Sequence, residues 1–445
     1  FQKYFNHIIS IKDGLGIVEP GVFYRDFEKE TLKQNLIFPP YPASREICAM
    51  GGIVNNNSGG EKSLEYGTTE EYIKKIKVVL SDGNIYEFKS LTQDELDQKM
   101  KQKDFEGEIY NKMYKLITNN YEQIKNAKPL VSKNSAGYYL WNVWDKEKRI
   151  FDLTKLFVGS QGTLGLLTEA SIKLIPTRKH SAMLIIFLHD FSSLGEIINQ
   201  VLLLKPNSFE AYDNNTLKLA LKFFPAFAKK LGTKTMITTA FQFLPEFLMF
   251  LRGGLRFPKL ILQVDFTSDD PNILKEKIKT LKEKLKPLHP STKIANENQE
   301  KKYWLIRRES FNLLRQKIHD KHTAPFIDDF AILPKYLSEF LPKLNLIFKK
   351  YPTLTYTIAG HVGDGNFHII PLMKIEDPKQ RAIIPILGKE VYDLVLSYKG
   401  STITAEHNDG LIRTPYLKQM YGEKIIYLFE QTKHIFDPLN IFNPR

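Results

Sequence analysis

The chain has little cysteine and no long apolar run, and these two features exclude several classes of protein. Its 445 residues include one cysteine, Cys48. These residues therefore exclude an internal disulfide framework, a cysteine-ligated zinc site and an iron–sulfur centre. Such cysteine usage fits a reducing, cytoplasmic compartment. No apolar stretch reaches the roughly 18 residues of a membrane span, and no secretory segment opens the chain. It begins with Phe1 rather than methionine, so we expect a processed or partial chain.

Several common nucleotide-binding and nucleic-acid-binding motifs are also missing. The sequence contains neither GxGxxG nor GxxxxGK[ST], which disfavours NAD binding on a Rossmann unit and nucleotide hydrolysis on a phosphate-binding loop. It also lacks a helix-turn-helix, a zinc finger and the basic-aromatic pattern of an RNA-binding sheet. The net charge of +13 favours anionic partners, but the missing motifs exclude nucleic acid from our expectation.

One basic, apolar segment has two interpretations. Between residues 217 and 262 large apolar side chains alternate with lysine and arginine, and acids are almost absent. A basic, partly buried helical insert would have this composition. A segment that lies on an anionic membrane surface would have it too, and the protein would then be peripheral on the inner face of the cell membrane.

The order of strands and helices predicts an α+β protein. With 42% hydrophobic and 12% aromatic residues, the chain can bury the cores of two or three domains. In the first part we expect strands at 8–11 and 16–19, a helix at 24–35 and a hairpin over 75–88 that turns at Asp82-Gly83. After Pro176 we expect an antiparallel sheet with strands at 183–189, 260–266, 326–333 and 355–359, separated by lysine-rich helices such as 273–284.

The segment from Gly360 to His368 is the most informative in the chain. Three glycines, two histidines, an aspartate and an asparagine occupy nine residues between two strand-like runs. The glycines let the backbone turn sharply, so we expect His361 and His368 to converge across the bend. A second dense segment supplies Glu406 and His407. Two imidazoles and a carboxylate are ordinary ligands of a divalent metal such as zinc or manganese.

Two glycine-rich loops occur earlier in the chain. Residues 51–60 read Gly-Gly-Ile-Val-Asn-Asn-Asn-Ser-Gly-Gly, and residues 159–165 read Gly-Ser-Gln-Gly-Thr-Leu-Gly. Such loops expose backbone N–H groups and tolerate the close approach of a large ligand. Either loop alone is also compatible with a mobile surface turn.

Taken in order, these segments resemble the FAD-linked oxidase family of 2-hydroxyacid dehydrogenases, which includes D-lactate and D-2-hydroxyglutarate dehydrogenases and the glycolate oxidase flavin subunit. The resemblance covers nearly the whole chain. It rests on residues 18–22, 39–44, 51–60, 66–69, 158–165, 360–368, 406–407 and 437–444.

The resemblance implies a domain plan and a cofactor. Residues 1–178 would form a two-lobed α+β FAD-binding domain of the PCMH type. Residues 179–400 would form the substrate-cap domain with its antiparallel sheet, and residues 401–445 would complete the active site and return to the FAD domain. The residues implied in FAD contact are Pro42, Gly51, Gly52, Asn57, Gly59, Tyr66, Gly67, Gly159, Gly162, Thr163, Gly165 and Asn443.

The resemblance also implies roles in catalysis. His361, His368 and Glu406 would hold the divalent metal, and His407 would be the base. Arg308 would clamp the substrate carboxylate, with Asn366 in the same pocket. The implied reaction is oxidation of a D-2-hydroxyacid to the 2-oxoacid, with a quinone, a cytochrome or an iron–sulfur subunit as electron acceptor.

Four features depart from the family pattern. The glycine-rich loop that binds the FAD pyrophosphate precedes the first matching segment in other members, so we expect the first lobe to be truncated here. Glu406-His407 continues as Asn408-Asp409-Gly410 rather than the commoner Gly-Ile/Val-Gly, as in a long branch with an added iron–sulfur module. Gln161 replaces a usual glutamate. Ile327 stands where 2-hydroxyglutarate enzymes have lysine, which favours lactate or glycolate as substrate.

Two alternative functions stay open from the sequence. A flavin-free, metal-dependent hydrolase could use His361, His368 and Glu406. A non-catalytic subunit could keep the fold and serve assembly or membrane docking through residues 217–262. Flavin content separates the first alternative from an oxidoreductase, and the effect of replacing His407 separates the second.

Overall fold

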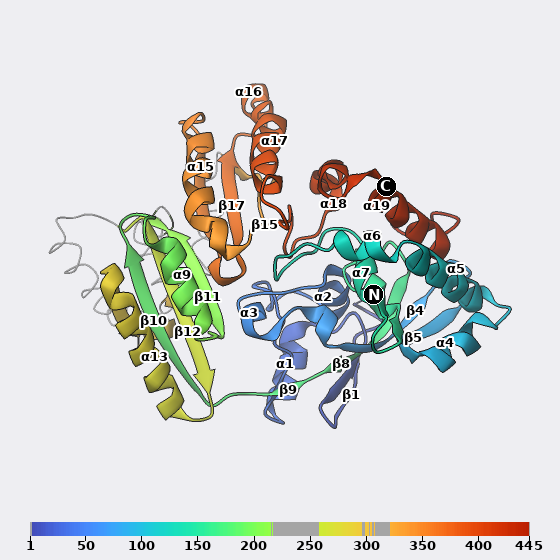
Figure 1. Cartoon of the computed structure of the whole chain (residues 1–445). Helices are drawn as coiled ribbons and strands as arrows, with labels where there is room; N and C mark the ends of the chain where they lie inside the picture. Colours follow the sequence, from blue (N-terminus) through green and yellow to red (C-terminus); the bar gives the residue numbers. More distant parts are fainter. Residues whose placement is uncertain are drawn as a thin grey trace. The chain divides into compact units, whose positions relative to one another are not determined.

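The computed structural model describes residues 2–214, 216, 258–295, 299–301, 303–304, 307 and 321–444. Arg308 and residues 217–257 of the basic apolar segment lie outside this range. The chain forms two compact units (Figure 1). The first unit comprises Phe1–Thr177 and Thr402–Arg445, and the second comprises Arg178–Ser401.

The first unit is built on an antiparallel sheet. Within its described residues the sheet has seven strands in the order β1-β2-β8-β4-β5-β7-β6, and each neighbouring pair is antiparallel. The strands are β1 (Ile8–Lys12), β2 (Leu15–Val18), β4 (Ile73–Val79), β5 (Ile85–Thr92), β6 (Trp144–Asp145), β7 (Ile150–Asp152) and β8 (Leu166–Lys173). A separate pair joins β3 (Leu36–Ile37) to β9 (Ile175–Pro176). The predicted hairpin is confirmed, with Val79 opposite Ile85.

Helices from both ends of the chain pack into the first unit. They are α1 (Tyr24–Leu32), α2 (Met50–Asn56), α3 (Ser63–Tyr66), α4 (Gln93–Met100), α5 (Phe105–Asn119), α6 (Tyr121–Asn126), α7 (Leu140–Val143), α8 (Thr154–Phe157), α18 (Gly410–Arg413) and α19 (Leu417–Phe436), with short η1 (Thr69–Glu71) and η5 (Thr414–Tyr416). The side chain of Asp104 caps α5 by accepting a hydrogen bond from the Gly107 amide at 2.9 Å, which satisfies one of the free donors at the helix start.

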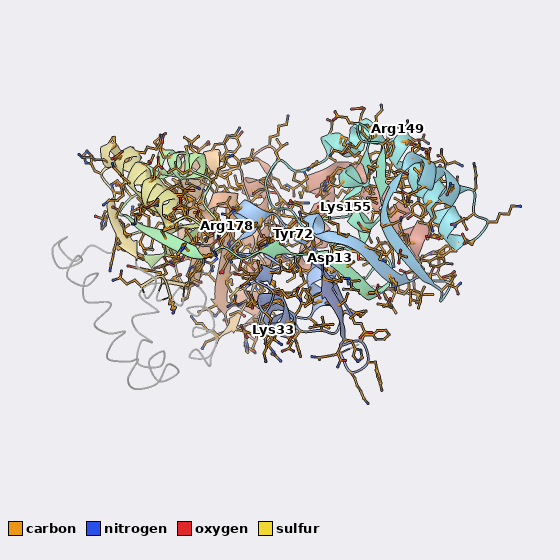
Figure 2. All side chains as sticks on the ribbon, turned by 90° about the horizontal axis from the view of Figure 1, so that it is seen from below. Asp13, Lys33, Tyr72, Arg149, Lys155 and Arg178 are labelled. Atoms are coloured by element: carbon orange, nitrogen blue, oxygen red, sulfur yellow. The ribbon has the colours of Figure 1, made fainter. Side chains whose placement is uncertain are left out.

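The core of the first unit joins the two ends of the chain. The ring of Phe157 lies 4.8 Å from that of Phe88 and 5.2 Å from that of Phe436, so α8, β5 and α19 share one apolar core. Near this core, Lys155 (labelled in Figure 2) donates a hydrogen bond to the backbone carbonyl of Glu70 at 2.8 Å. Buried apolar contacts of this kind fix residues 402–444 on the same unit as residues 2–177.

The second unit contains a larger antiparallel sheet. Within the described residues it has eight strands in the order β13-β10-β12-β11-β16-β17-β14, and β15 also pairs with β17. The strands are β10 (His180–Leu188), β11 (Ser208–Asp213), β12 (Leu260–Ser268), β13 (Ser291–Ala295), β14 (His322–Thr323), β15 (Phe330–Ala331), β16 (Thr355–His361) and β17 (Asn366–Met373). The pairings that β10, β12, β11, β16 and β17 make with one another are all antiparallel. This confirms the α+β class with an antiparallel sheet that the alternating texture predicted.

Helices cover one face of this sheet. They are α9 (Leu194–Leu203), α13 (Pro271–Leu285), α15 (Leu337–Lys349), α16 (Pro378–Arg381) and α17 (Ile383–Leu396), with η2 (Lys286–Leu288), η3 (Pro334–Tyr336) and η4 (Val362–Asp364). Asp270 caps α13, and the helix buries Leu274, Ile278, Leu281 and Leu285 at helical spacing. This spacing places the four side chains on one face of the helix, and α13 packs on β10 and β12 (Figure 1).

One predicted strand is much shorter than expected. The apolar pattern predicts a strand over 326–333, but only Phe330–Ala331 pairs, with Phe367 and Asn366. Asp329 has a φ of 72°, a left-handed conformation that an extended strand cannot contain. The predicted strands at 183–189, 260–266 and 355–359 are confirmed as β10, β12 and β16. Within the described ranges, no helix is long and apolar enough to span a bilayer.

Candidate functional site

The hairpin of β16, η4 and β17 carries the two histidines of the dense glycine segment. His361 pairs with Asn366 and Ala359 pairs with His368, so His361, Asn366 and His368 share one face of the sheet. The two imidazole rings lie 5.4 Å apart and nearly perpendicular. The predicted convergence across the bend is therefore confirmed. At Gly365, with φ of +66°, a side chain would collide with the Ile332 carbonyl, so the tight turn requires glycine.

Each imidazole is oriented by a carboxylate from another element of the second unit. His361 Nδ1 lies 2.6 Å from Glu210 Oε1 on β11, and His368 Nδ1 lies 3.1 Å from Asp328 Oδ1. A carboxylate is an acceptor, so in each pair Nδ1–H donates. The other nitrogen, Nε2, then points away from the carboxylate on each ring. Histidines that bind metal through one nitrogen commonly donate the other to a carboxylate, so this pair fits the predicted metal role.

Glu210 also binds an arginine. Because Ala211 pairs with Gly360, Glu210 stands opposite His361 on the sheet. Its second oxygen, Oε2, accepts a hydrogen bond from Arg307 Nε at 3.1 Å. The Glu210 side chain is 1% exposed and that of Arg307 is 15% exposed. The carboxylate thus joins a guanidinium to an imidazole within the second unit.

Asn366 is fixed at one end and has an unsatisfied oxygen at the other. Its Nδ2 donates to Asp329 Oδ1 and to the Phe330 carbonyl, both at 3.1 Å. Its Oδ1 is buried and has no hydrogen-bond partner among the described residues. Buried polar atoms are nearly always satisfied, so this oxygen fits the predicted role of Asn366 in holding a ligand.

The prediction of a loop over 51–60 is wrong for its first part, because Met50–Asn56 form α2, so that only the residues after Asn56 form a loop. The two glycine-rich segments, 51–60 and 159–165, lie side by side in the first unit. The amide of Gly159 donates to the Val54 carbonyl at 3.0 Å, and that of Gln161 donates to the Asn55 carbonyl at 2.9 Å. A Cβ added at Gly52 or at Gly162 would meet no atom within 4 Å. Open space therefore borders the backbone of both loops, which is the arrangement a large flat cofactor needs.

Other residues predicted to contact FAD gather around these loops. Asn57 Nδ2 donates to the Tyr139 hydroxyl at 3.2 Å, and the Thr163 hydroxyl lies 2.6 Å from the Tyr138 hydroxyl. Asn443 Nδ2 donates to the Gln161 carbonyl at 3.3 Å. Asn57, Thr163 and Asn443 thus make hydrogen bonds within the first unit, an arrangement that is compatible with FAD binding there.

Several residues of the predicted FAD set are also closely packed against the protein itself. A side chain at Gly51 would collide with Pro20, and one at Gly165 would collide with Val78 on β4. Gly59 lies close to the Ser63 hydroxyl, and Gly67 has a φ of +73° next to Glu71. Pro42 lies beside Gly60, and Tyr66 ends α3. Which members of this set contact FAD stays a prediction.

Glu406 and His407 lie in the first unit on a segment that residues 133–137 support. The Glu406 side chain is 11% exposed, and its Oε2 lies 3.3 Å from the Nζ of buried Lys133. Its backbone carbonyl accepts a hydrogen bond from Asn56 Nδ2 at 2.7 Å. His407 is more open, with 45% of its side chain exposed and its Nε2 3.9 Å from Glu406 Oε1. An exposed imidazole beside a fixed carboxylate can exchange protons with a bound ligand.

The sequence reasoning missed Glu210, Asp328 and Lys133. A weak signal existed for the two acids, because Glu210 lies between Phe209 and Ala211, and Asp328 with Asp329 interrupts the apolar stretch 326–333. Lys133 had no comparable signal, since the sequence contains many lysines. Arg308 lies outside the described residues.

Asp409 is a buried acid next to this segment. Its Oδ2 accepts a hydrogen bond from the Gly137 amide at 2.8 Å, and its Oδ1 is buried without a hydrogen-bond partner among the described residues. Burial raises the pKa of Asp409 to about 7, although the Gly137 hydrogen bond and the charge of Arg413 act in the opposite direction.

The raised pKa predicts a pH-dependent stability. Between pH 4 and 7 the folded chain keeps the Asp409 proton and the unfolded chain loses it, so the free energy of unfolding falls as pH rises through this range. Asp409→Asn cannot ionise. We expect the mutant's stability, relative to the wild type, to improve by about 4 kcal/mol from pH 4 to pH 8, at about 1.4 kcal/mol per pKa unit. Urea denaturation at pH 4.5, 6 and 8 measures the free energy of unfolding of both proteins. A constant difference between mutant and wild type across these pH values would contradict the prediction.

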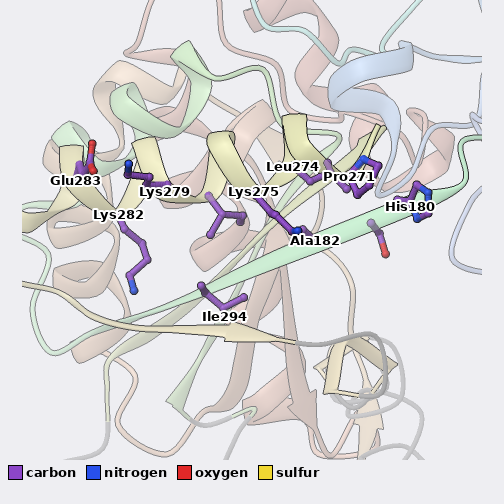
Figure 3. A pocket seen from close by; sticks show the side chains of 11 residues that line it. His180, Ala182, Pro271, Leu274, Lys275, Lys279, Lys282, Glu283 and Ile294 are labelled. Atoms are coloured by element: carbon purple, nitrogen blue, oxygen red, sulfur yellow. The ribbon is translucent and has the colours of Figure 1, made fainter. Parts of the chain in front are cut away.

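The second unit also has a pocket that none of the predicted site residues lines. It has a volume of about 630 Å³ and lies between α13 and strands β10 and β13 (Figure 3). Its floor is apolar, with Ala182, Leu274 and Ile294, and lysines such as Lys275 and Lys279 line it as well. Its lining has no paired histidines or other convergent ligating groups, so it does not compete with the hairpin as the reactive site.

Comparisons with known proteins identify both parts of the chain. Residues 177–445 match the model of the C-terminal domain of FAD linked oxidases, and residues 1–89 match that of an FAD binding domain. The chain is 25% identical to the D-2-hydroxyglutarate dehydrogenase of Escherichia coli (strain K12), a match that covers 100% of this chain and 42% of that protein. It is 25% identical to the glycolate oxidase subunit GlcD of Bacillus subtilis (strain 168), covering 99% of this chain and 77% of the other.

The similarity extends to solved structures. A 4-ethylphenol oxidase from Gulosibacter chungangensis superposes with a TM-score of 0.62 at 13% identity, over 100% of this chain and 78% of that one. A substrate-bound p-cresol methylhydroxylase gives 0.61 at 16% identity, over 98% and 76%. These likenesses support the fold. The chain spans less than half the length of the D-2-hydroxyglutarate dehydrogenase from Escherichia coli.

Proposed function

The chain belongs to the family of FAD-linked oxidases, and on that premise we propose that it takes part in oxidising a D-2-hydroxyacid to the corresponding 2-oxoacid. Relatives named for this chemistry include the D-2-hydroxyglutarate dehydrogenase of Escherichia coli and the D-lactate dehydrogenase of Archaeoglobus fulgidus, which is 24% identical over 98% of this chain. The observation that carries the proposal is the pair of carboxylate-oriented imidazoles on the β16–β17 hairpin.

The proposed roles follow from the chemistry of the side chains. FAD, when bound, supplies the hydride acceptor, and a divalent metal supplies a Lewis acid for the substrate hydroxyl. We propose His361, His368 and Glu406 as ligands of that metal, zinc or manganese. Two imidazoles and one carboxylate suit either ion.

We further propose that His407 accepts the hydroxyl proton. A neutral imidazole nitrogen can accept a proton from an activated hydroxyl. Asn366 would accept one hydrogen bond from the substrate through Oδ1, because its Nδ2 already donates to Asp329 and Phe330. An arginine would hold the substrate carboxylate through two parallel hydrogen bonds and so fix the reacting carbon.

Two arginines can be distinguished as the carboxylate clamp. The family resemblance assigns this role to Arg308, whereas Arg307 is the guanidinium that Glu210 connects to His361. We expect Arg308→Met to raise KM for the acid by about 10- to 100-fold, because hydrogen bonds to charged groups contribute about 1.5–3 kcal/mol. Arg307→Met is the matched variant. Steady-state kinetics of the two variants distinguish the two arginines. A large rise of KM in Arg307→Met alone would assign the carboxylate clamp to Arg307.

The function itself is tested by turnover with a dye as electron acceptor. The full-length gene product should reduce the dye with D-lactate, D-2-hydroxyglutarate or glycolate, and should not respond to L-lactate. Turnover with the L-acid alone would contradict the proposed stereochemistry. The match to an FAD binding domain does not favour the flavin-free hydrolase.

We propose that electrons then pass to a quinone, a cytochrome or an iron–sulfur partner. These residues contain one cysteine, so the ligands of an iron–sulfur acceptor would come from an extension of this chain or from a separate subunit. Rapid reduction of an added quinone analogue by the substrate-reduced protein, against slow reduction of oxygen, would support a dedicated acceptor. Rapid reaction with oxygen alone would oppose it.

A further inference from the structure

A short segment of the first unit supports the residues predicted at the metal site. The Ser135 amide donates to the Thr404 carbonyl at 3.0 Å. Asn408 donates twice to Ser135, from its amide to the hydroxyl at 2.9 Å and from Nδ2 to the carbonyl at 3.1 Å. The Gly137 amide donates to Asp409 Oδ2. Residues 133–137 and 404–409 therefore lie side by side, held by hydrogen bonds along their length.

Lys133 is the charged residue of the segment 133–137. It is 1% exposed, although lysine is almost never fully buried without a partner. Its Nζ donates to the Gly60 carbonyl at 3.1 Å and to Glu406 Oε2 at 3.3 Å. Gly60 ends the first glycine loop. One ammonium thus contacts both a loop predicted to bind FAD and a carboxylate predicted to bind metal.

The contact with Glu406 constrains how its carboxylate is presented. Oε2 faces Lys133, whereas Oε1 lies 3.9 Å from His407 Nε2. The backbone of Glu406 is held independently by Asn56, the last residue of α2 in the first glycine-rich segment. The contacts to the backbone and to Oε2 thus restrict the orientation in which the Glu406 carboxylate meets a ligand. Outer contacts of this kind commonly change metal affinity by about 10- to 100-fold.

We propose that Lys133 is a positioning residue that links the flavin loop to the metal ligand Glu406. It holds the Gly60 carbonyl and the Glu406 carboxylate in one arrangement, so that its loss weakens the binding of both the metal and FAD. This inference rests on the proposed function, because it takes Glu406 as a metal ligand and the first glycine loop as part of the FAD site.

Binding measurements on Lys133→Met test the link. This change keeps an unbranched side chain and removes the charge and the donor. We expect Mn²⁺ affinity, measured by calorimetry on metal-stripped full-length protein, to fall by about 10- to 100-fold. We expect FAD affinity, measured by quenching of flavin fluorescence, to fall in the same protein.

A second ion pair provides the matched control. Lys99 Nζ lies 2.6 Å from Oε2 of buried Glu106, on α4 and α5, which carry none of the predicted site residues. Lys99→Met also removes a lysine from a buried carboxylate. It therefore shows how far the loss of such an ion pair away from the predicted site changes ligand affinity. Its affinities for Mn²⁺ and FAD should equal those of the wild type.

Lys133→Gln removes the positive charge of residue 133 but keeps a hydrogen-bond donor. It replaces Lys133→Met in the test if the methionine variant does not fold. Its amide can still donate to Gly60, so FAD affinity should be better preserved than Mn²⁺ affinity. If a folded Lys133 variant binds both ligands as the wild type does, or loses affinity for only one in the methionine form, the link is wrong and the proposed function stands. A wild type that binds neither ligand would overturn both.

Discussion

Replacing His407 with asparagine is expected to lower the rate of flavin reduction by the substrate by about 10²- to 10⁴-fold, the usual contribution of a positioned acid or base. FAD should remain bound, because none of the hydrogen bonds between the two glycine loops involves His407. Asparagine keeps a polar side chain of similar size and cannot accept the proton near neutral pH. Stopped-flow absorbance under anaerobic conditions measures the rate directly.

His322 offers a matched control for this experiment. It is also an exposed histidine beside a carboxylate, with Nε2 3.1 Å from Glu376 Oε1 and 59% of its side chain exposed. His322→Asn should leave the rate unchanged. If His407→Asn reduces flavin as fast as the wild type does, His407 is not the base, and another group must accept the hydroxyl proton.

Replacing Glu210 with alanine should affect both stability and metal binding. The carboxylate is almost completely buried and holds His361 Nδ1 on one oxygen and Arg307 Nε on the other. Its removal leaves Arg307 without this counter-charge in a partly buried position, and breaking a buried ion pair costs about 3–5 kcal/mol. It also releases the His361 ring, so metal affinity should fall by about 10- to 100-fold. Urea denaturation and metal titration give the two values.

Glu339 provides the comparison for Glu210. It pairs with Lys343 on α15 at the surface, where both side chains are more than half exposed. Exposed pairs contribute little to stability because solvent screens them, so Glu339→Ala should change stability little and metal affinity not at all. Equal effects of the two alanine variants would show that Glu210 has no special role at His361.

The hairpin and its histidines could be predicted because their signals are local. Glycine spacing and the flanking apolar runs determine a turn between two strands, and the period of two along a strand then places His361 and His368 on one face. The same local logic gave the turn at Asp82-Gly83 and the amphipathic helix α13. The strand expected at 326–333 failed because its apolar pattern carries no sign of the left-handed backbone at Asp329.

The partners of these residues could not be predicted from local patterns. Glu210 is 151 positions from His361, and Lys133 is 273 positions from Glu406. Such pairs form only when strand order and loop packing are known, and neither follows from composition or periodicity. The sequence therefore indicated which residue types would bind a metal, while the structure shows the carboxylates and the lysine that orient them.

The most direct test of the proposed D-2-hydroxyacid oxidation is an anaerobic visible spectrum of the full-length gene product. It is recorded before and after addition of D-lactate, D-2-hydroxyglutarate or glycolate. Oxidised flavin absorbs in the visible range and loses this absorbance when it accepts a hydride. We expect at least one of these acids to bleach the flavin and L-lactate to leave it oxidised. A flavin-containing protein that none of the acids bleaches would contradict it.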